Sequence, residues 1–152
     1  MKRIEIKLSL PVVAPLLDVM KGSSESLGKN LAAPLVMTDL EPDFHKDWKA
    51  DLLISQTSDM QVLLALFDEN FFSEGVIGLD ETNAEPVVRA CAAVRLQLRE
   101  KYLKSLGDEL LESSQVELTQ LEEPLRKAFM CYLFLATLQE LIIQHLDPSA
   151  TE

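Results

Sequence analysis

The sequence predicts an all-α fold, a compact bundle of about five helices with one short β-strand at its N-terminal edge. Apolar residues recur at helical spacing over residues 43–146, whereas strict alternation is confined to residues 3–10. The chain has 5 glycines and 7 prolines, too few for a loop-rich fold. Its 152 residues suit one domain with a single core. We therefore expect residues 1–152 to form a single helical domain.

The strand signal lies at residues 3–10, where apolar and polar side chains alternate. Such a pattern is typical of a half-buried strand, which needs a neighbour because a lone strand is not stable. Residues 35–37 and residues 76–77 are the candidate partners within the chain. The same strand of a second chain is the third candidate.

A short helix is expected next, over residues 11–21, with Leu16 and Met20 on its inner face. Residues 22–41 then begin with glycine and serines and show no periodicity. We expect them to form a mobile surface loop that separates the N-terminal segment from the helical bundle of residues 43–146.

Four stronger helical patterns follow, at residues 43–55, 59–72, 82–106 and 119–146. Capping signals precede the last three: Thr57-Ser58-Asp59, a capping box from Thr82 to Glu85, and a second box from Thr119 to Glu122. Gly107 is expected to end the third helix. The last helix is apolar on more than one face, which predicts either a central position or packing on a second chain.

The charge balance excludes one class of partner. With 25 acidic and 14 basic residues the net charge is -11, whereas binding of nucleic acid requires clustered lysine and arginine. The acidic residues either cap helices and confer solubility or form a face that attracts a basic protein. The candidate acidic face consists of Asp59, Asp68, Glu69 and Glu74.

Motifs for catalysis, metals and cofactors are not found in the sequence. His45 and His145 are far apart, and neither lies in a cluster of ligands. The segment from Gly22 to Gly28 has the wrong spacing for a phosphate-binding loop. We therefore expect a protein that is not an enzyme and that has no metal, cofactor, nucleic acid or membrane contact.

Cys91 and Cys131 each lie in an apolar helical stretch, where a free thiol behaves as a small buried hydrophobe. The N-terminus lacks an export signal, and no membrane-spanning segment is expected. The free buried thiols and the absence of an export signal both predict a cytoplasmic location. Residues 62–67 and 129–138 are apolar nearly all round, so they either fill the core or are covered by a second copy of the chain or by another protein. We expect a homodimer.

The two long helices carry a family pattern. Leu79, Ala84 and the run RACAAVRLQL of residues 89–98, followed by Tyr132-Leu133 and Leu138-Gln139-Glu140-Leu141, resemble the bacterial domain-of-unknown-function family 2017 over roughly residues 40–146. The resemblance implies an acidic helical fold without an established activity. It also implies a candidate polar cluster between the two helices, formed by Arg95, Gln139 and Glu140, to which we add Tyr132 as the fourth member.

The predicted function is a non-enzymatic protein–protein interaction module with an acidic face and a basic protein partner. One alternative is a small-molecule binder or small enzyme with a pocket between the last two helices, around Arg95, Tyr132 and Glu140. Another is an acidic inhibitor or immunity-type protein. We also expect Arg95 to form an ion pair with Glu140 and thereby order the bundle.

Overall fold

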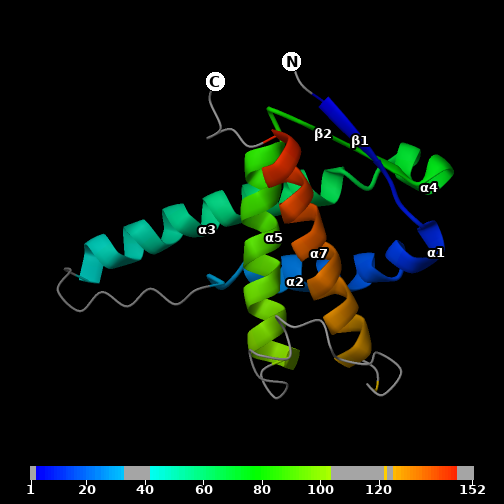
Figure 1. Cartoon of the computed structure of the whole chain (residues 1–152). Helices are drawn as coiled ribbons and strands as arrows, with labels where there is room; N and C mark the ends of the chain where they lie inside the picture. The colour runs from blue at the N-terminus through cyan, green and yellow to red at the C-terminus, as the bar shows by residue number, and fades with distance from the viewer. Residues whose placement is uncertain (1–2, 33–41, 104–121, 123–124, 147–152) are drawn as a thin grey trace.

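The computed structural model describes residues 3–32, 42–103, 122 and 125–146. In chain order they form β1 (Arg3–Lys7), α1 (Leu10–Val13), α2 (Leu16–Leu27), α3 (Pro42–Ala65), α4 (Glu69–Glu74), β2 (Val76–Asp80), α5 (Ala84–Leu98), the π-helix η1 (Arg99–Leu103) and α7 (Leu125–Leu146). A helical bundle with one short β element confirms the predicted fold class (Figure 1).

Helices α5 and α7 form the centre of the bundle, side by side and antiparallel (Figure 1). Helix α7 ends at Leu146, where the sequence predicts its end. Its buried face covers the core side of α5, and α2 and α3 pack across this pair. The buried residues of α7 are Ala128, Phe129, Cys131, Tyr132, Leu135, Leu138, Ile142 and Leu146.

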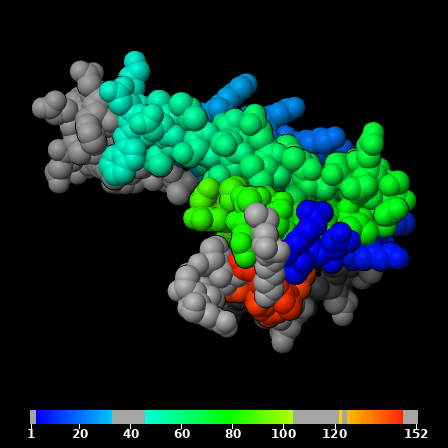
Figure 2. Space-filling view, turned by 90° about the horizontal axis from the view of Figure 1, so that it is seen from above, coloured from blue at the N-terminus to red at the C-terminus, as the bar shows by residue number. Residues whose placement is uncertain are grey.

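Helix α3 extends well beyond the rest of the bundle at its N-terminal end, as both views show (Figures 1 and 2). Its C-terminal half packs on α5 and α2 and buries Met60 and Leu63. On the projecting half, Trp48 is 37% exposed and Ile54 is 68% exposed. One helix therefore has a buried half and a half whose apolar side chains contact solvent.

The two strands pair antiparallel, with Arg3 opposite Asp80 and Lys7 opposite Val76. This pairing confirms residues 76–77 as the partner of the predicted strand. The strand itself ends at Lys7 rather than at residue 10, because Leu10 already begins α1. The other internal candidate, residues 35–37, lies outside the described residues.

The N-terminal helical region differs from the prediction. The helix expected over residues 11–21 is divided into α1 and α2, with Pro15 at the start of α2. The loop expected over residues 22–41 is helical as far as Leu27, and residues 33–41 lie outside the described chain. Ser23 is 6% exposed and Leu27 is 1% exposed, so tertiary packing outweighs the low helix propensity of this glycine- and serine-rich stretch.

The predicted break between residues 55 and 59 is also wrong, because α3 is continuous through it. Asp59, expected to cap a new helix, instead binds a side chain of α5. Residues 66–68 interrupt the helix later, and Asp68 caps α4 by accepting hydrogen bonds from the amides of Asn70 (3.0 Å) and Phe71 (3.3 Å). Tertiary contact thus decides which of two possible caps is used.

The capping box predicted at Thr82 is not formed. The carboxylate of Asp80 accepts hydrogen bonds from the amides of Thr82 (2.8 Å) and Asn83 (3.1 Å) and from the Thr82 hydroxyl. The hydrogen bond from the Thr82 side chain is the main reason why the pKa of Asp80 is lowered. The Glu85 carboxylate forms an ion pair with Arg89 and does not reach back to the start of the helix as the capping box requires. Helix α5 therefore begins one residue later than the box implies, at Ala84.

The helix predicted over residues 82–106 ends as an α-helix at Leu98 and continues as the π-helix η1, which buries Leu103. Residues 104–107, with the expected end of the helix, lie outside the described part of the chain. So does most of the second capping box, since only Glu122 of it is described.

Candidate functional site

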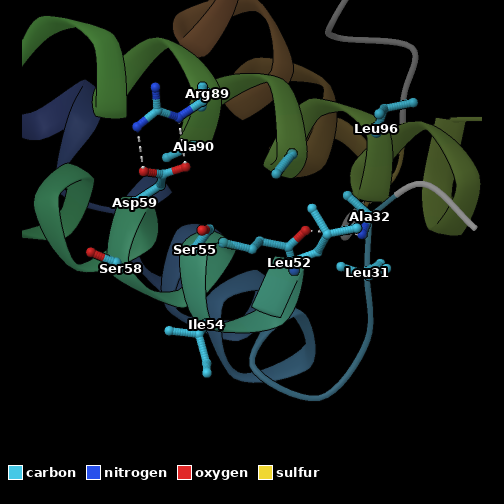
Figure 3. A pocket seen from close by; sticks show the side chains of 12 residues that line it. Leu31, Ala32, Leu52, Ile54, Ser55, Ser58, Asp59, Arg89, Ala90 and Leu96 are labelled. Carbon is cyan, nitrogen blue, oxygen red and sulfur yellow. Dashed lines mark hydrogen bonds and ion pairs between the residues drawn. The ribbon is translucent and has the colours of Figure 1, made fainter. Parts of the chain in front are cut away.

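The largest cavity that we describe is an open groove between α3 and α5, with a volume of about 830 Å³ (Figure 3). Its wall is completed by the segment that follows α2. Most of the lining surface is apolar. The lining residues are Leu31, Ala32, Leu52, Ile54, Ser55, Gln56, Ser58, Asp59, Arg89, Ala90, Ala93 and Leu96.

One end of the groove is closed by a bidentate ion pair between α5 and α3. Arg89 donates from Nε to Oδ2 of Asp59 and from Nη2 to Oδ1, both at 3.0 Å (Figure 3). Its Nη1 lies 2.9 Å from Glu85. The hydrogen bond to Asp59 raises the pKa of Arg89, so this guanidinium is charged throughout the accessible pH range. The pair sets the position of α3 against α5 at this end.

The wall opposite α5 is positioned by a single side chain of α3. The Nε2 of Gln56 donates to the carbonyl oxygens of Leu27 (2.6 Å) and Asn30 (2.9 Å), and its Oε1 accepts from the amide of Ala32 (3.1 Å). These bonds hold the chain after α2 against α3. They place Leu31 and Ala32 at the groove, where the amide of Gln56 satisfies main-chain groups that would otherwise lack partners.

The apolar surface of the groove is only partly buried. Leu96 of α5 is 41% exposed, and Ile54 at the rim is 68% exposed, with its side chain turned away from α5 (Figure 3). Next to Leu96 the α5 wall consists of the half-buried Ala93 and the buried Ala90, whose small side chains leave the space between the helices unfilled. Clustered apolar side chains at a concave surface are typical of a binding site rather than of scattered surface residues.

Three of the four residues of the predicted polar cluster are in contact. Nη1 of Arg95 donates to Oε1 of Gln139 at 2.7 Å, and the guanidinium carbon lies 4.5 Å from the centre of the Tyr132 ring. Gln139 in turn donates from Nε2 to the carbonyl of Val88 at 3.0 Å. The cluster therefore links α5 to α7 through hydrogen bonds and a cation–π contact.

The predicted ion pair between Arg95 and Glu140 is wrong. Glu140 is exposed and accepts a hydrogen bond from Gln144 at 3.2 Å, while Arg95 turns to Gln139 and Tyr132. Adjacent residues of a helix point in different directions, so only one of Gln139 and Glu140 can face α5. The Nε of Arg95 is buried without a hydrogen-bond partner. The guanidinium thus occupies the α5–α7 contact where the sequence predicts a pocket, and the large cavity lies along α3 instead.

The candidate acidic face is divided by the structure. Asp59 is bound by Arg89, and its side chain is 13% exposed. Asp68 caps α4. Glu69 and Glu74 are exposed on α4, so they remain from the predicted set as carboxylates that a partner can approach.

Both cysteines are free and fully buried, as predicted for small core hydrophobes. Burial raises the pKa of each thiol to about 12, and at Cys91 the nearby Cys131 raises it further. At neutral pH both thiols are protonated and are poor nucleophiles. Within the described residues, no group of three or more His, Cys, Asp or Glu side chains could hold a metal ion.

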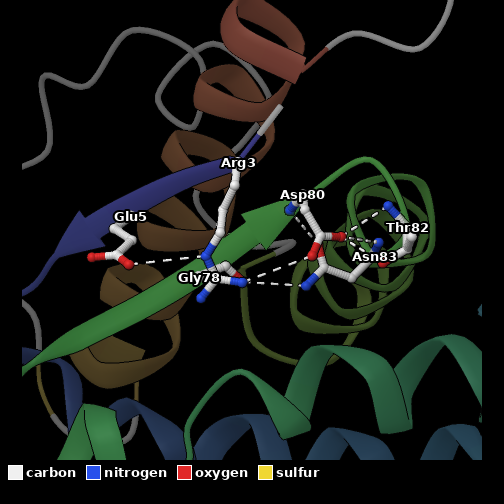
Figure 4. Close-up of polar contacts among 6 residues, drawn as sticks. All are labelled: Arg3, Glu5, Gly78, Asp80, Thr82 and Asn83. Carbon is white, nitrogen blue, oxygen red and sulfur yellow. Dashed lines mark hydrogen bonds and ion pairs between the residues drawn. The ribbon is translucent and has the colours of Figure 1, made fainter. Parts of the chain in front are cut away.

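A second polar feature, which the sequence analysis missed, lies on the sheet (Figure 4). The Arg3 side chain crosses β2 directly over Gly78 and approaches Glu5 (3.9 Å) and Asp80 (3.8 Å). A Cβ at position 78 would overlap the guanidinium. The available signal was a glycine inside a strand, which marks a place where another group approaches closely.

Among the described helices, α7 alone is long and apolar enough to cross a membrane, with a mean hydropathy of 1.3 in its most apolar window. One such helix is weak evidence for a membrane span, so the expectation of no membrane-spanning segment stays a prediction. In that window 39% of the residues are buried in the bundle, and α7 packs on α5 and α2. Core helices of soluble proteins share this length and composition, so the cytoplasmic location stays a prediction.

No protein-family model matches the chain, and searches of curated proteins and of solved structures find no significant match. The resemblance to family 2017 therefore also stays a prediction. Function has to be argued from the residues of this chain alone.

Proposed function

We propose that this chain is a non-enzymatic protein–protein interaction module that binds an apolar segment of its partner in the groove between α3 and α5. The observation that carries the proposal is a groove of about 830 Å³ with a mainly apolar lining, at which Leu96 is 41% exposed. Exposed apolar side chains gathered in a concavity are a typical feature of surfaces that bind a partner. Amphipathic helices commonly dock in such grooves.

The charge of the protein supports a basic partner. The net charge is -11, and Asp51 on the groove helix and Glu69 and Glu74 on α4 are exposed. A partner that carries lysine or arginine beside its apolar residues would be attracted by this field before it docks. The raised pKa of both cysteines supports a non-enzymatic role, because it removes the strongest side-chain nucleophiles of the described core. We propose the cytoplasm as the location.

A small-molecule binder is the second candidate, and the size of the groove favours it. Ligand pockets commonly enclose about 300–1,000 Å³, a range that includes this groove of about 830 Å³. The polar groups Ser55, Ser58 and Arg89 could orient such a ligand. In this alternative the ligand binds in the α3–α5 groove and not between α5 and α7, where the sequence predicts a pocket.

The test is a pull-down from the native cell extract with three baits: the wild-type chain, Leu96→Ser and Ile143→Ser. Ile143 is the matched control, because it is an aliphatic residue 55% exposed on α7, outside the lining of the groove. We expect one protein to be retained by the wild type and the control and lost with Leu96→Ser, and to be released by high salt. Retention of that protein by all three baits would contradict binding in the groove. Retention of no protein, with a thermal shift from small molecules that Leu96→Ser abolishes, would favour the second candidate.

A further inference from the structure

The outer edge of β1 carries main-chain groups that β2 does not use. The amide of Leu8 donates to the carbonyl of Gly75 at 2.6 Å, so Leu8 and Gly75 form a hydrogen-bonded pair of the ladder. In an antiparallel ladder such pairs alternate with non-hydrogen-bonded ones. The register then makes Ile4 and Ile6 the other bonded residues of β1. The amides and carbonyls of Glu5 and Lys7 therefore point away from β2.

The apolar face of the sheet is buried unequally. Ile77 and Leu79 of β2 are 1% and 0% exposed, whereas Ile4 and Ile6 of β1 are only half-buried. Within the part of the chain that the structure describes, the sheet has two strands and β1 has a neighbour on one side only. A further strand beside β1 would cover the remaining surface of both isoleucines and satisfy the outward main-chain groups.

The side chains of β1 are complementary to a second copy of the same strand. If two β1 strands pair antiparallel with Ile6 opposite Ile6, then each Glu5 lies opposite Lys7 of the second copy. These are the residues whose main-chain groups point outward, and opposite charges at facing positions stabilise a sheet. Among the described residues Lys7 has no ion pair, so its charge is available to a second chain.

Neighbouring registers fit less well. With Glu5 opposite Glu5, each Arg3 would face Lys7, and like charges would meet at every facing charged position. With Arg3 opposite Glu5, the salt bridge would use a guanidinium that already lies over Gly78 beside Asp80. We propose that two copies of this chain associate through their β1 edges, with Ile6 at the two-fold axis, to form one four-stranded antiparallel sheet.

This association goes beyond the proposed function and uses a different surface. It gives the predicted homodimer a definite geometry, in which the apolar faces of both sheets lie on the same side and the charged side chains on the other. A short edge contact buries little area, so we expect a dimer that forms in the micromolar range and dissociates on dilution.

The test is sedimentation equilibrium of the full chain over a wide concentration range, with charge-swapped variants. Lys7→Glu and Glu5→Lys each place like charges opposite one another twice per dimer, and we expect each to raise the dissociation constant roughly tenfold or more. The double variant Glu5→Lys/Lys7→Glu restores opposite charges at the same positions, so its dissociation constant should return to that of the wild type. Both side chains are exposed, and thermal unfolding will verify that each variant is folded.

Hydrogen exchange supplies the second measurement. The amides of Glu5 and Lys7 should exchange more slowly as the protein concentration rises, because only the second copy protects them. A chain that is monomeric at every concentration would overturn the proposal. So would a dimer that all three variants leave unchanged, because its interface would then lie elsewhere. Tighter association of Lys7→Glu would also overturn it, since that outcome belongs to the register with Glu5 opposite Glu5.

Discussion

Helix α5 makes two contacts that differ in how well they are filled. Toward α7 it presents Cys91, Val94 and Leu98, all at most 1% exposed, and the Arg95 guanidinium covers Tyr132. Toward α3 it presents Ala90 and Ala93, and a groove of about 830 Å³ lies in front of them. The size of a few side chains on one helix thus decides which contact belongs to the core and which is left for a partner.

The two contacts are also fastened differently. At the α5–α7 contact Arg95 donates to Gln139, whereas on the α3 side Arg89 binds Asp59 and Gln56 binds the chain after α2. The bonds of the α3 side fix the segments that line the groove beside one another, so the groove keeps its shape without being filled. We expect the two contacts to respond in opposite ways to substitution, with stability affected at one and binding at the other.

The largest effect is expected from truncation of the filled contact. Leu135 of α7 is 0% exposed, so Leu135→Ala should lower the free energy of unfolding by roughly 2–5 kcal/mol through lost burial and a new cavity. Ile54→Ala in the groove should change it by less than about 1 kcal/mol, because Ile54 is 68% exposed. Urea unfolding followed by circular dichroism will measure both. Equal losses at the two sites would show that the groove is part of the core.

An intermediate effect is expected from pH, through the two thiols of the filled contact. Their folded pKa of about 12 exceeds the usual value near 8.5, so the unfolded state loses these protons first as the pH rises. Stability should therefore be intact below about pH 8.5 and fall from there toward pH 12; over the first part of this range, to about pH 9.5, the loss should be roughly 1 kcal/mol per thiol. Urea unfolding at several pH values will measure this, with Cys91→Ala/Cys131→Ala as the control that should lose less stability over this range.

The smallest effect on stability, and a large one on binding, is expected from filling the groove. Ala93 is half-buried on the groove wall, so Ala93→Leu extends into open space instead of into the core. The free energy of unfolding should change by no more than about 1 kcal/mol, while retention of the partner in the pull-down should be lost. Ala92→Leu, at an exposed position of α5 outside the lining of the groove, is the matched control. If Ala93→Leu retained the partner as well as the wild type does, the partner would not bind in the groove.

Much of the fold could be predicted because it depends on local patterns. The alternation at Ile4 and Ile6 identified the strand, and the apolar spacing of α7 identified the central helix. Capping was predicted less well because it depends on competition between side chains. Asp59 and Thr82 both fit a capping position by sequence, but Asp59 is bound by Arg89 of a distant helix, and the Thr82 hydroxyl is bound by Asp80, the last residue of β2.

The groove could not be predicted because its walls come from three separate segments. Leu31, Ile54 and Ala93 show no shared period, and the groove forms only where Gln56 and Arg89 join their segments side by side. The polar cluster was easier, since Arg95 and Gln139 lie on two long helices that were expected to pack. Even there the choice of Gln139 over Glu140 depends on the rotation of α7 about its axis. Periodicity predicts which face of a helix is buried, but it does not distinguish between two adjacent residues such as these.

The pairing of β1 with β2 has a consequence for the growing chain on the ribosome. Arg3 faces Asp80, so its strand has no partner within the sheet until Asp80 has also been synthesised. At about 5–20 residues per second this interval lasts roughly 4–15 seconds, without the further delay of the exit tunnel. During that time Ile4 and Ile6 belong to an unpaired segment of the nascent chain. The step that pairs β1 with β2 is therefore set by the timing of translation as well as by packing.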